Sequence, residues 1–205
     1  MASDKKELFS DFDFAGALEF LDLFPYKKWQ PEIHPIPPSD LLKGNLKRAE
    51  RQITTGANAW EQRLFMELVF LEALENHDIR MWQERPIDAG SAPFRGKVDF
   101  AFTPYRASLG LPYVVLSEAK KDDFEKGWGQ CLMAAKTASL LNEREGHRFD
   151  TIYGIVSNGR IWEFGKYTRH NEFYKTGAYS LEQSSVLLGI LHLIFQECEK
   201  ARYFG

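Results

Sequence analysis

Hydrophobic and polar positions follow two different periods along the chain, and the shorter period marks predicted strands. Three runs rich in β-branched and aromatic residues lie close together, at 79–87, 97–105 and 111–120. Leu109 and Gly110 separate the second run from the third, which predicts a hairpin. Two later runs, FDTIYGIVS and RIWEFGKYT, flank Asn158-Gly159, a dipeptide typical of tight turns between strands. The pattern therefore predicts two groups of strands.

Apolar residues at helical spacing mark the segments around these strands. We expect helices near 11–24, 40–54, 59–76, 123–142 and 180–200. Residues that favour a helix N-terminus precede three of them, namely Ser39 or Asp40, Asn58, and Asp122 or Asp123. The helix after Asn58 is apolar on nearly every side, so we expect neighbours to bury it on several faces. The Pro-rich segment 31–40 predicts a loop or an extended strap.

The order of these elements predicts the fold class. A helix, three strands, a helix, two strands and a final helix imply an α/β protein with a mixed central β-sheet flanked by helices. At 205 residues the chain suits one globular unit, since domains of this size bury roughly 70% of the surface of the unfolded chain. Within it we expect residues 1–57 to be a helical and Pro-rich extension packed on a core formed by 58–205.

Composition narrows the classes of function. Hydrophobic residues make up 44% and charged residues 27% of the chain, as in ordinary soluble proteins, and no stretch is long and apolar enough to cross a bilayer. The N-terminal segment has acidic residues where a secretory signal needs an uninterrupted apolar run, so we expect a cytoplasmic protein. Cys131 and Cys198 suggest neither a disulfide framework nor a zinc site, and we expect buried thiols.

The net charge of -3 argues against bulk electrostatic binding to a polyanion. Any contact with nucleic acid must then come from a local basic surface. The predicted helix at 40–54 offers one through Lys43, Lys47, Arg48 and Arg51. A second basic set, for which a solvated surface is the alternative, comprises Arg144, Arg148, Arg160, Lys166, Arg169 and Lys175.

The candidate chemistry lies on two neighbouring predicted strands. Successive side chains of a strand point to opposite faces, so Glu118 and Lys120 in Ser-Glu-Ala-Lys project from the same side. The apolar run before them is typical of a central strand, where a buried charge needs a partner. The same alternation places Asp99 on one face, with Val98 and Phe100 expected on the other. Carboxylates suit Mg²⁺ or Mn²⁺, so the two strands predict a metal site.

Together these residues resemble the PD-(D/E)XK nuclease superfamily over roughly 58–165. Asp99 matches the acidic residue of that motif, and Glu118-Ala119-Lys120 matches its E-x-K element. The resemblance implies a restriction-endonuclease-like αβββαβ core and hydrolysis of phosphodiester bonds, with DNA as the expected partner. It also implies Mg²⁺ (or Mn²⁺) held by Asp99, Glu118 and a Glu of the preceding helix. Glu61 is our choice for that Glu, and Glu67 is its rival.

The resemblance also assigns roles to other residues. Superfamily members commonly carry a Gln near the start of the helix after E-x-K, which is Gln130 here, whereas the Tyr found four residues on in some members is Ala134. Lys120 is expected to orient the attacking water or to stabilise the phosphate in the transition state. A homodimer would let two such sites address a duplex. Glu61 has a second interpretation as an ordinary helix-surface residue, since Arg63, Glu72 and Glu75 near it could simply be solvated.

For several other residues, and for the activity of the whole chain, the sequence leaves two interpretations open. Trp128 and Trp162 could stack on bases, but aromatic residues at such positions belong more often to a core. The five histidines are scattered, with no pair at metal-ligand spacing, and we expect only His170, beside Arg169, to approach phosphate. A catalytically silent nuclease-like module that binds nucleic acid or a protein partner is the alternative to an active enzyme.

Overall fold

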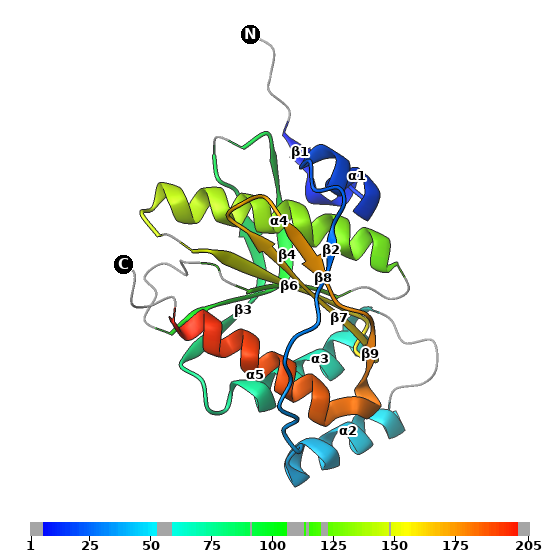
Figure 1. The fold of residues 1–205 in the computed structure, drawn as a ribbon. Coiled ribbons are helices and arrows are strands. Elements are labelled where there is room, and N and C mark those ends of the chain that lie inside the picture. Colours follow the sequence, from blue (N-terminus) through cyan, green and yellow to red (C-terminus); the bar gives the residue numbers. More distant parts are fainter. Residues whose placement is uncertain are drawn as a thin grey trace.

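The structure is a computed structural model that describes residues 6–52, 59–90, 92–105, 113, 115–119, 123–147 and 149–200, with the side chains of 59–62 and 115–119 outside that description. Within these ranges, helices cover both faces of a mixed β-sheet (Figure 1). The expected α/β class, with a mixed central sheet flanked by helices, is therefore confirmed.

The elements follow the predicted order, with additional short strands. The helices are α1 (Phe14–Phe20), α2 (Asp40–Gln52), α3 (Ala59–Leu74), α4 (Phe124–Arg144) and α5 (Ser184–Lys200), with 3₁₀ turns η1 (Phe9–Asp11) and η3 (Leu181–Gln183). The longer strands are β3 (Ile79–Ile87), β4 (Phe94–Pro104), β5 (Val115–Ala119), β6 (Thr151–Ser157) and β7 (Ile161–Thr168). The short strands are β1 (Glu7–Leu8), β2 (Lys27–Lys28), β8 (Phe173–Lys175) and β9 (Tyr179–Ser180).

The strands form one sheet in the order β1-β4-β5-β6-β7-β8-β2, with β3 beside β4 and β9 beside β7. Neighbours from β3 to β5 and from β6 to β8 are antiparallel, whereas β5 and β6 are parallel. A parallel pair needs a crossover, and α4 provides it. The C-terminal ends of β5 and β6 therefore lie side by side, with Ala119 paired to Ser157.

Two hydrophobic cores lie on the two faces of the sheet. One lies on the α1 and α4 side and contains Trp128 and Cys131, and the other lies on the α3 and α5 side and contains Trp162 and Cys198. Both indoles are at most 1% exposed, so the core interpretation of these tryptophans is confirmed. Both cysteines are buried free thiols, as expected.

The N-terminal segment 6–39 lies along the sheet and contributes to its packing. It adds β1 beside β4 and β2 beside β8, both parallel to their partners. The ring of Phe9 lies directly on Gly96, where an added Cβ would approach the ring to 2.2 Å. Further on, the predicted strap is confirmed: it runs toward α2 (Figure 1), and Ile36 N donates to Ser185 O at 2.9 Å.

The described helix N-termini agree with the predicted capping residues. Ser39 Oγ accepts a hydrogen bond from Leu42 N at 3.0 Å, and an Asp123 oxygen accepts one from Lys126 N at 2.8 Å. The helix expected at 11–24 is shorter, because Asp13 caps its first turn and the helix ends at Phe20. The hairpin residues Leu109 and Gly110 lie outside the described residues, as does Asn58.

The expected alternation around Asp99 is wrong. Val98 belongs to the core under α4, whereas Phe100 belongs to the core under α3 and α5, so these two side chains lie on opposite faces. The cause is a local break in the hairpin, where Glu84 has a φ of 51° within β3. The β3–β4 pairing register is the same on both sides of Glu84 and Asp99. At this point, however, the alternation of side chains between the two faces of the sheet shifts by one residue on both strands.

Candidate functional site

Acidic residues from three neighbouring strands lie in one row of the sheet. The β3–β4 ladder pairs Gln83 with Phe100 and Arg85 with Val98, so Glu84 lies opposite Asp99. In the next ladder the last pair is Phe100 with Ser117, and Asp99 and Glu118 are the next residues on the two strands. The side chain of Asp99 is only 12% exposed, so its charge needs a partner.

Arg63, from the first half of α3, supplies that partner. Its Nη2 atom pairs with Asp99 and its Nη1 atom pairs with Glu84. Lys97 adds a second cation to Glu84. The hydrogen bond from Lys97, opposed by partial burial and reinforced by Arg63, lowers the pKa of Glu84. Burial opposes the charge of Arg63, but Asp99 and Glu84 outweigh it and raise the pKa of the guanidinium.

Some predicted site residues are described only in part. The backbone of Glu118 lies in β5, beside Val156 of β6. Its side chain, the side chain of Glu61 and the whole of Lys120 lie outside the described residues. The convergence of Glu118 and Lys120 on Asp99 therefore stays a prediction.

Among the described side chains of α3, the cation Arg63 pairs with Asp99. Glu67 accepts a hydrogen bond from Gln83 Nε2 at 3.2 Å, and Arg63 lies one turn earlier on the same helix. The interpretation of Arg63 as merely solvated is wrong, because Asp99 and Glu84 pair with it. Arg63 and Glu67 are four residues apart, a spacing in the sequence that already indicated a shared helix face. Nothing in the sequence identified Glu84.

Gln130 lies half-buried in the second turn of α4, the helix on the other side of the sheet. The adjacent network belongs to Trp128, whose Nε1 donates to Glu163 at 2.6 Å, and Glu163 also pairs with Lys175 at 2.7 Å. Glu163 pairs with Val156 and Val156 with Glu118, so this network lies in the row that contains Asp99. The catalytic role of Gln130 stays a prediction.

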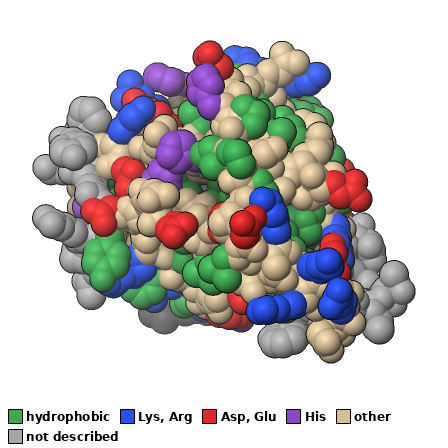
Figure 2. Space-filling view, turned by 90° about the horizontal axis from the view of Figure 1, so that it is seen from below, with side chains coloured by type: hydrophobic (Ala, Val, Ile, Leu, Met, Phe, Trp, Pro, Cys, Tyr) green, Lys and Arg blue, Asp and Glu red, His purple; other side chains and the backbone are tan. Residues whose placement is uncertain are grey.

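The basic residues of α2 are exposed near this end of the sheet. Lys43, Lys47, Arg48 and Arg51 all face solvent, and Figure 2 shows Lys and Arg side chains gathered on the right-hand part of the face that carries α2. The C-terminal half of α2 lies against the turn after β6, because Arg160 pairs with Glu50 at 2.7 Å and stacks on Phe65. That turn follows Ser157, the partner of Ala119, so α2 flanks the end of β5.

The second predicted basic set is dispersed. Arg160 and Arg169 flank opposite ends of β7, and most members pair with an acid. The pairs are Arg144–Glu145, Arg160–Glu50, Arg169–Asp150 and Lys175–Glu163. Lys166 instead lies over the rings of Trp29 and Tyr174. The described members therefore do not form one continuous rim, and Arg148 lies outside the described residues.

Two histidines that are distant in sequence lie in contact. His77 Nε2 lies 2.9 Å from His192 Nδ1, and His77 Nδ1 lies 3.0 Å from a Glu199 oxygen. At the other end, Gln196 Nε2 lies 2.8 Å from His192 Nε2. His170 lies in the loop after β7, where Arg169 Nε approaches its Nε2 at 3.4 Å. Within the described residues, no three His, Cys, Asp or Glu side chains gather so as to hold a metal ion.

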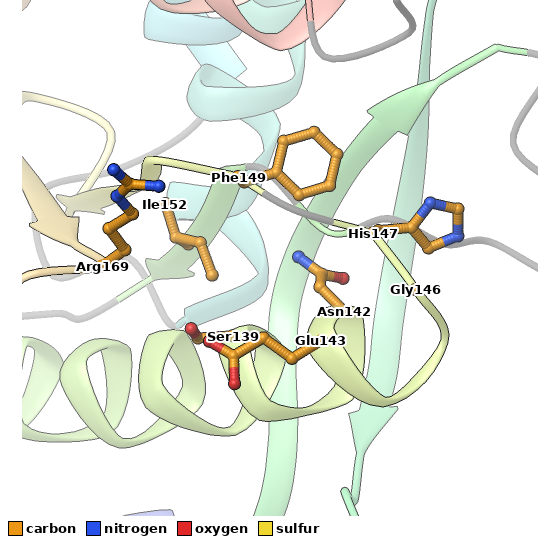
Figure 3. A pocket seen from close by; sticks show the side chains of 8 residues that line it. All are labelled: Ser139, Asn142, Glu143, Gly146, His147, Phe149, Ile152 and Arg169. Carbon is orange, nitrogen blue, oxygen red and sulfur yellow. The ribbon is translucent and has the colours of Figure 1, made fainter. Parts of the chain in front are cut away.

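A cavity of about 540 Å³ lies at the opposite end of the sheet from this row (Figure 3). It lies between the C-terminal half of α4 and the start of β6, and its lining includes Asn142, Glu143, His147 and Arg169. The Asn142 amide is already used, because it exchanges two hydrogen bonds with the backbone of Tyr113. Size alone therefore does not make this cavity the candidate site.

The Asp99 carboxylate is an oxygen donor of the kind that a hard divalent cation prefers. None of the described helices has the length and apolar character needed to cross a membrane. Comparison of the chain with models of known protein families gives no match, and comparison with curated proteins gives none either.

Proposed function

We propose that this chain is a metal-dependent nuclease that hydrolyses phosphodiester bonds of DNA, with a restriction-endonuclease-like αβββαβ core. The order α3, β3, β4, β5, α4, β6, with β5 parallel to β6, supports this core. One observation carries the function: the little-exposed Asp99 lies on the strand next to that of Glu118 and is paired with a cation. A carboxylate in that setting favours a positive charge near it.

The proposed site uses Mg²⁺ or Mn²⁺. Asp99 and Glu118 would hold the ion, with Glu61 as the proposed third ligand, because carboxylate oxygens are the donors that these ions prefer. When bound, the ion supplies an activated water molecule and offsets the charge that develops on the phosphate.

The remaining proposed roles belong to the chain's own side chains. Lys120 orients the attacking water or stabilises the phosphate in the transition state. Gln130 assists from the start of α4. The exposed basic residues of α2 contact phosphates of the DNA backbone and so position the duplex. A homodimer would provide one site for each strand, and sedimentation velocity with and without a short duplex measures that association.

The test incubates the purified chain with circular and linear DNA, single- and double-stranded, in Mg²⁺ or Mn²⁺ and then in chelator. We expect cleavage that needs the metal, and cleavage of circles would establish endonuclease action. Asp99→Ala and Lys120→Ala should each lower the cleavage rate by at least about 100-fold, because each removes a group that acts on the reacting phosphate.

Asp40→Asn is the matched control, because this Asp is 99% exposed on α2 and its loss should leave cleavage within about twofold. Circular dichroism should show that all variants remain folded. If the Asp99 and Lys120 variants cut DNA as fast as the unmodified chain, the assignment of this site is wrong.

A catalytically silent module that binds nucleic acid or a protein partner is the second candidate. The observation in its favour is that Arg63 already neutralises Asp99, in a chain whose net charge is -3. Calorimetric titration with Mn²⁺ separates the two functions. Binding that disappears in Glu118→Ala supports the nuclease, whereas absence of binding together with retained affinity for DNA supports the silent module.

A further inference from the structure

The break in the β3–β4 hairpin turns two carboxylates toward one guanidinium. On one side of the break, Ile87 of β3 and Val98 of β4 belong to the core under α4. On the other side of the break, Trp82 of β3 and Ala101 of β4 belong to the same core. Uninterrupted alternation from Trp82 and Ala101 would therefore send Glu84 and Asp99 to the α4 face. Instead both carboxylates pair with Arg63 of α3. The shift of alternation on both strands thus brings both carboxylates to Arg63.

The left-handed backbone of Glu84 makes this arrangement costly to form. A φ of 51° inside a strand lies in the left-handed region, which is unfavourable for a residue with a side chain. Compensation comes from the ion pairs of Glu84 with Arg63 and Lys97. The guanidinium uses different nitrogen atoms for its two partners, so it can lose one contact and keep the other.

We infer that Arg63 is a positioning residue that occupies the cation position beside Asp99 until a divalent metal binds, while Glu84 keeps the guanidinium within the site. This inference rests on the proposed nuclease function. Two cations cannot share one carboxylate at full strength, so entry of the metal displaces Arg63 from Asp99. Because Nη1 stays paired with Glu84, the displaced guanidinium remains within reach of a substrate phosphate, a group that Arg binds well.

This role predicts opposite effects on metal affinity and on cleavage. Arg63→Gln removes the competing cation, so Mn²⁺ should bind about five- to fiftyfold more tightly in calorimetric titration without DNA. The same variant should cleave DNA at least about tenfold more slowly, with the loss in kcat, because the phosphate loses the guanidinium. A residue that only supports the fold would not tighten metal binding.

Lys97→Gln is the matched control, since it removes one positive charge that pairs with Glu84 and is 54% exposed. It should change the Mn²⁺ affinity by less than about twofold, because exposed charges are screened. Arg63→Lys keeps the charge but not the two-armed geometry, and it should give an intermediate Mn²⁺ affinity. The lysine variant also keeps the test valid if the glutamine variant does not fold.

A second readout measures thermal unfolding with and without Mn²⁺. Without metal, Arg63→Gln should unfold at a lower temperature than the unmodified chain, and Mn²⁺ should raise that temperature by more than it does in the unmodified chain. Equal Mn²⁺ affinities in the unmodified chain, Arg63→Gln and Arg63→Lys would overturn the inference, and so would absence of Mn²⁺ binding in all three.

The two proposals fail in different ways. If Arg63→Gln tightens Mn²⁺ binding but the unmodified chain cuts no DNA, the cation role stands and the nuclease function falls. If the unmodified chain cuts DNA but the Arg63 variants leave Mn²⁺ affinity unchanged, the nuclease function stands and the cation role falls.

Discussion

His77 and His192 are linked in a chain of polar contacts that runs from Gln196 to Glu199. Gln196 Nε2 donates to His192, His192 Nδ1 donates to His77, and His77 Nδ1 donates to Glu199, an assignment that satisfies each of these contacts with one proton per ring. Burial and the neighbouring His77 lower the pKa of His192, while Glu199 acts in the opposite sense. The folded protein therefore favours the neutral form of His192.

This pKa shift predicts a pH-dependent stability. Since the pKa of His192 is lower in the folded state than in the unfolded state, its contribution is complete above about pH 6.5 and declines as the pH falls below that value. We expect His192→Gln to flatten the dependence of the unfolding free energy on pH between 5 and 7.5, by less than about 1 kcal/mol because the ring is partly exposed.

Urea unfolding at several pH values measures this effect. His170→Gln is the control, because His170 lies exposed in a loop and its loss should leave the slope unchanged. Equal slopes for the unmodified chain and the His192 variant would contradict the prediction.

Contacts of single residues divide into those that the sequence predicted and those that it did not. The burial of Trp128 and Trp162 was predictable, because large aromatic residues at apolar-patterned positions belong in a core. The pairing of His77 with His192 spans 115 residues, and that of Arg63 with Asp99 spans 36. Neither separation follows the period of a helix or a strand, so only the folded backbone brings these side chains together.

Within the elements, one glycine of α4 fixes the position of the N-terminal segment. An added Cβ on Gly129 would lie 2.4 Å from Phe12 O and 2.6 Å from the carbonyl carbon of Asp13, which are backbone atoms that cannot move aside as a side chain can. We expect Gly129→Ala to lower the free energy of unfolding by about 1–3 kcal/mol through overpacking, as measured by denaturant unfolding.

Gly44→Ala is the matched control in α2, where an added Cβ would meet nothing within 4 Å. That substitution should instead raise the free energy of unfolding by about 0.5–1 kcal/mol, because Ala favours a helix interior more than Gly does. Loss of stability in both variants would contradict the prediction for Gly44.

The sequence predicted long elements better than short ones. The span of β3 agrees with the prediction to the residue, because nine residues give a clear composition. β1 and β2 have two residues each, too few to show any period, and each is defined by its pairing with a distant strand, β4 or β8. The break at Glu84 and Asp99 was also missed, since alternation inferred from sequence assumes an unbroken strand.

At the scale of the whole molecule, residues 6–52 are part of the packing and not an accessory. Phe9, Phe14 and Leu18 belong to the core under α4, and Leu42 and Ala49 belong to the core on the other face. We expect Phe9→Ala to lower the free energy of unfolding by about 3–5 kcal/mol, because this ring is 1% exposed and its loss leaves a cavity.

Phe20→Ala provides the comparison, since Phe20 lies in the same segment but is 49% exposed, and its loss should cost about 1 kcal/mol. Chemical denaturation followed by tryptophan fluorescence measures both variants. Similar small losses for the two would mean that the segment packs only loosely on the sheet.

The strand β2 has a consequence for the order in which the chain can fold during synthesis. Lys27 donates a hydrogen bond to Glu172, which lies 145 residues further along the chain. At ribosomal rates of about 5–20 residues per second, the partner emerges roughly 7–30 s after Lys27. During that interval Phe14, which packs on the ring of Phe173, lacks that neighbour. The segment that contains Phe14 and Lys27 thus leaves the ribosome well before the strand on which it finally packs.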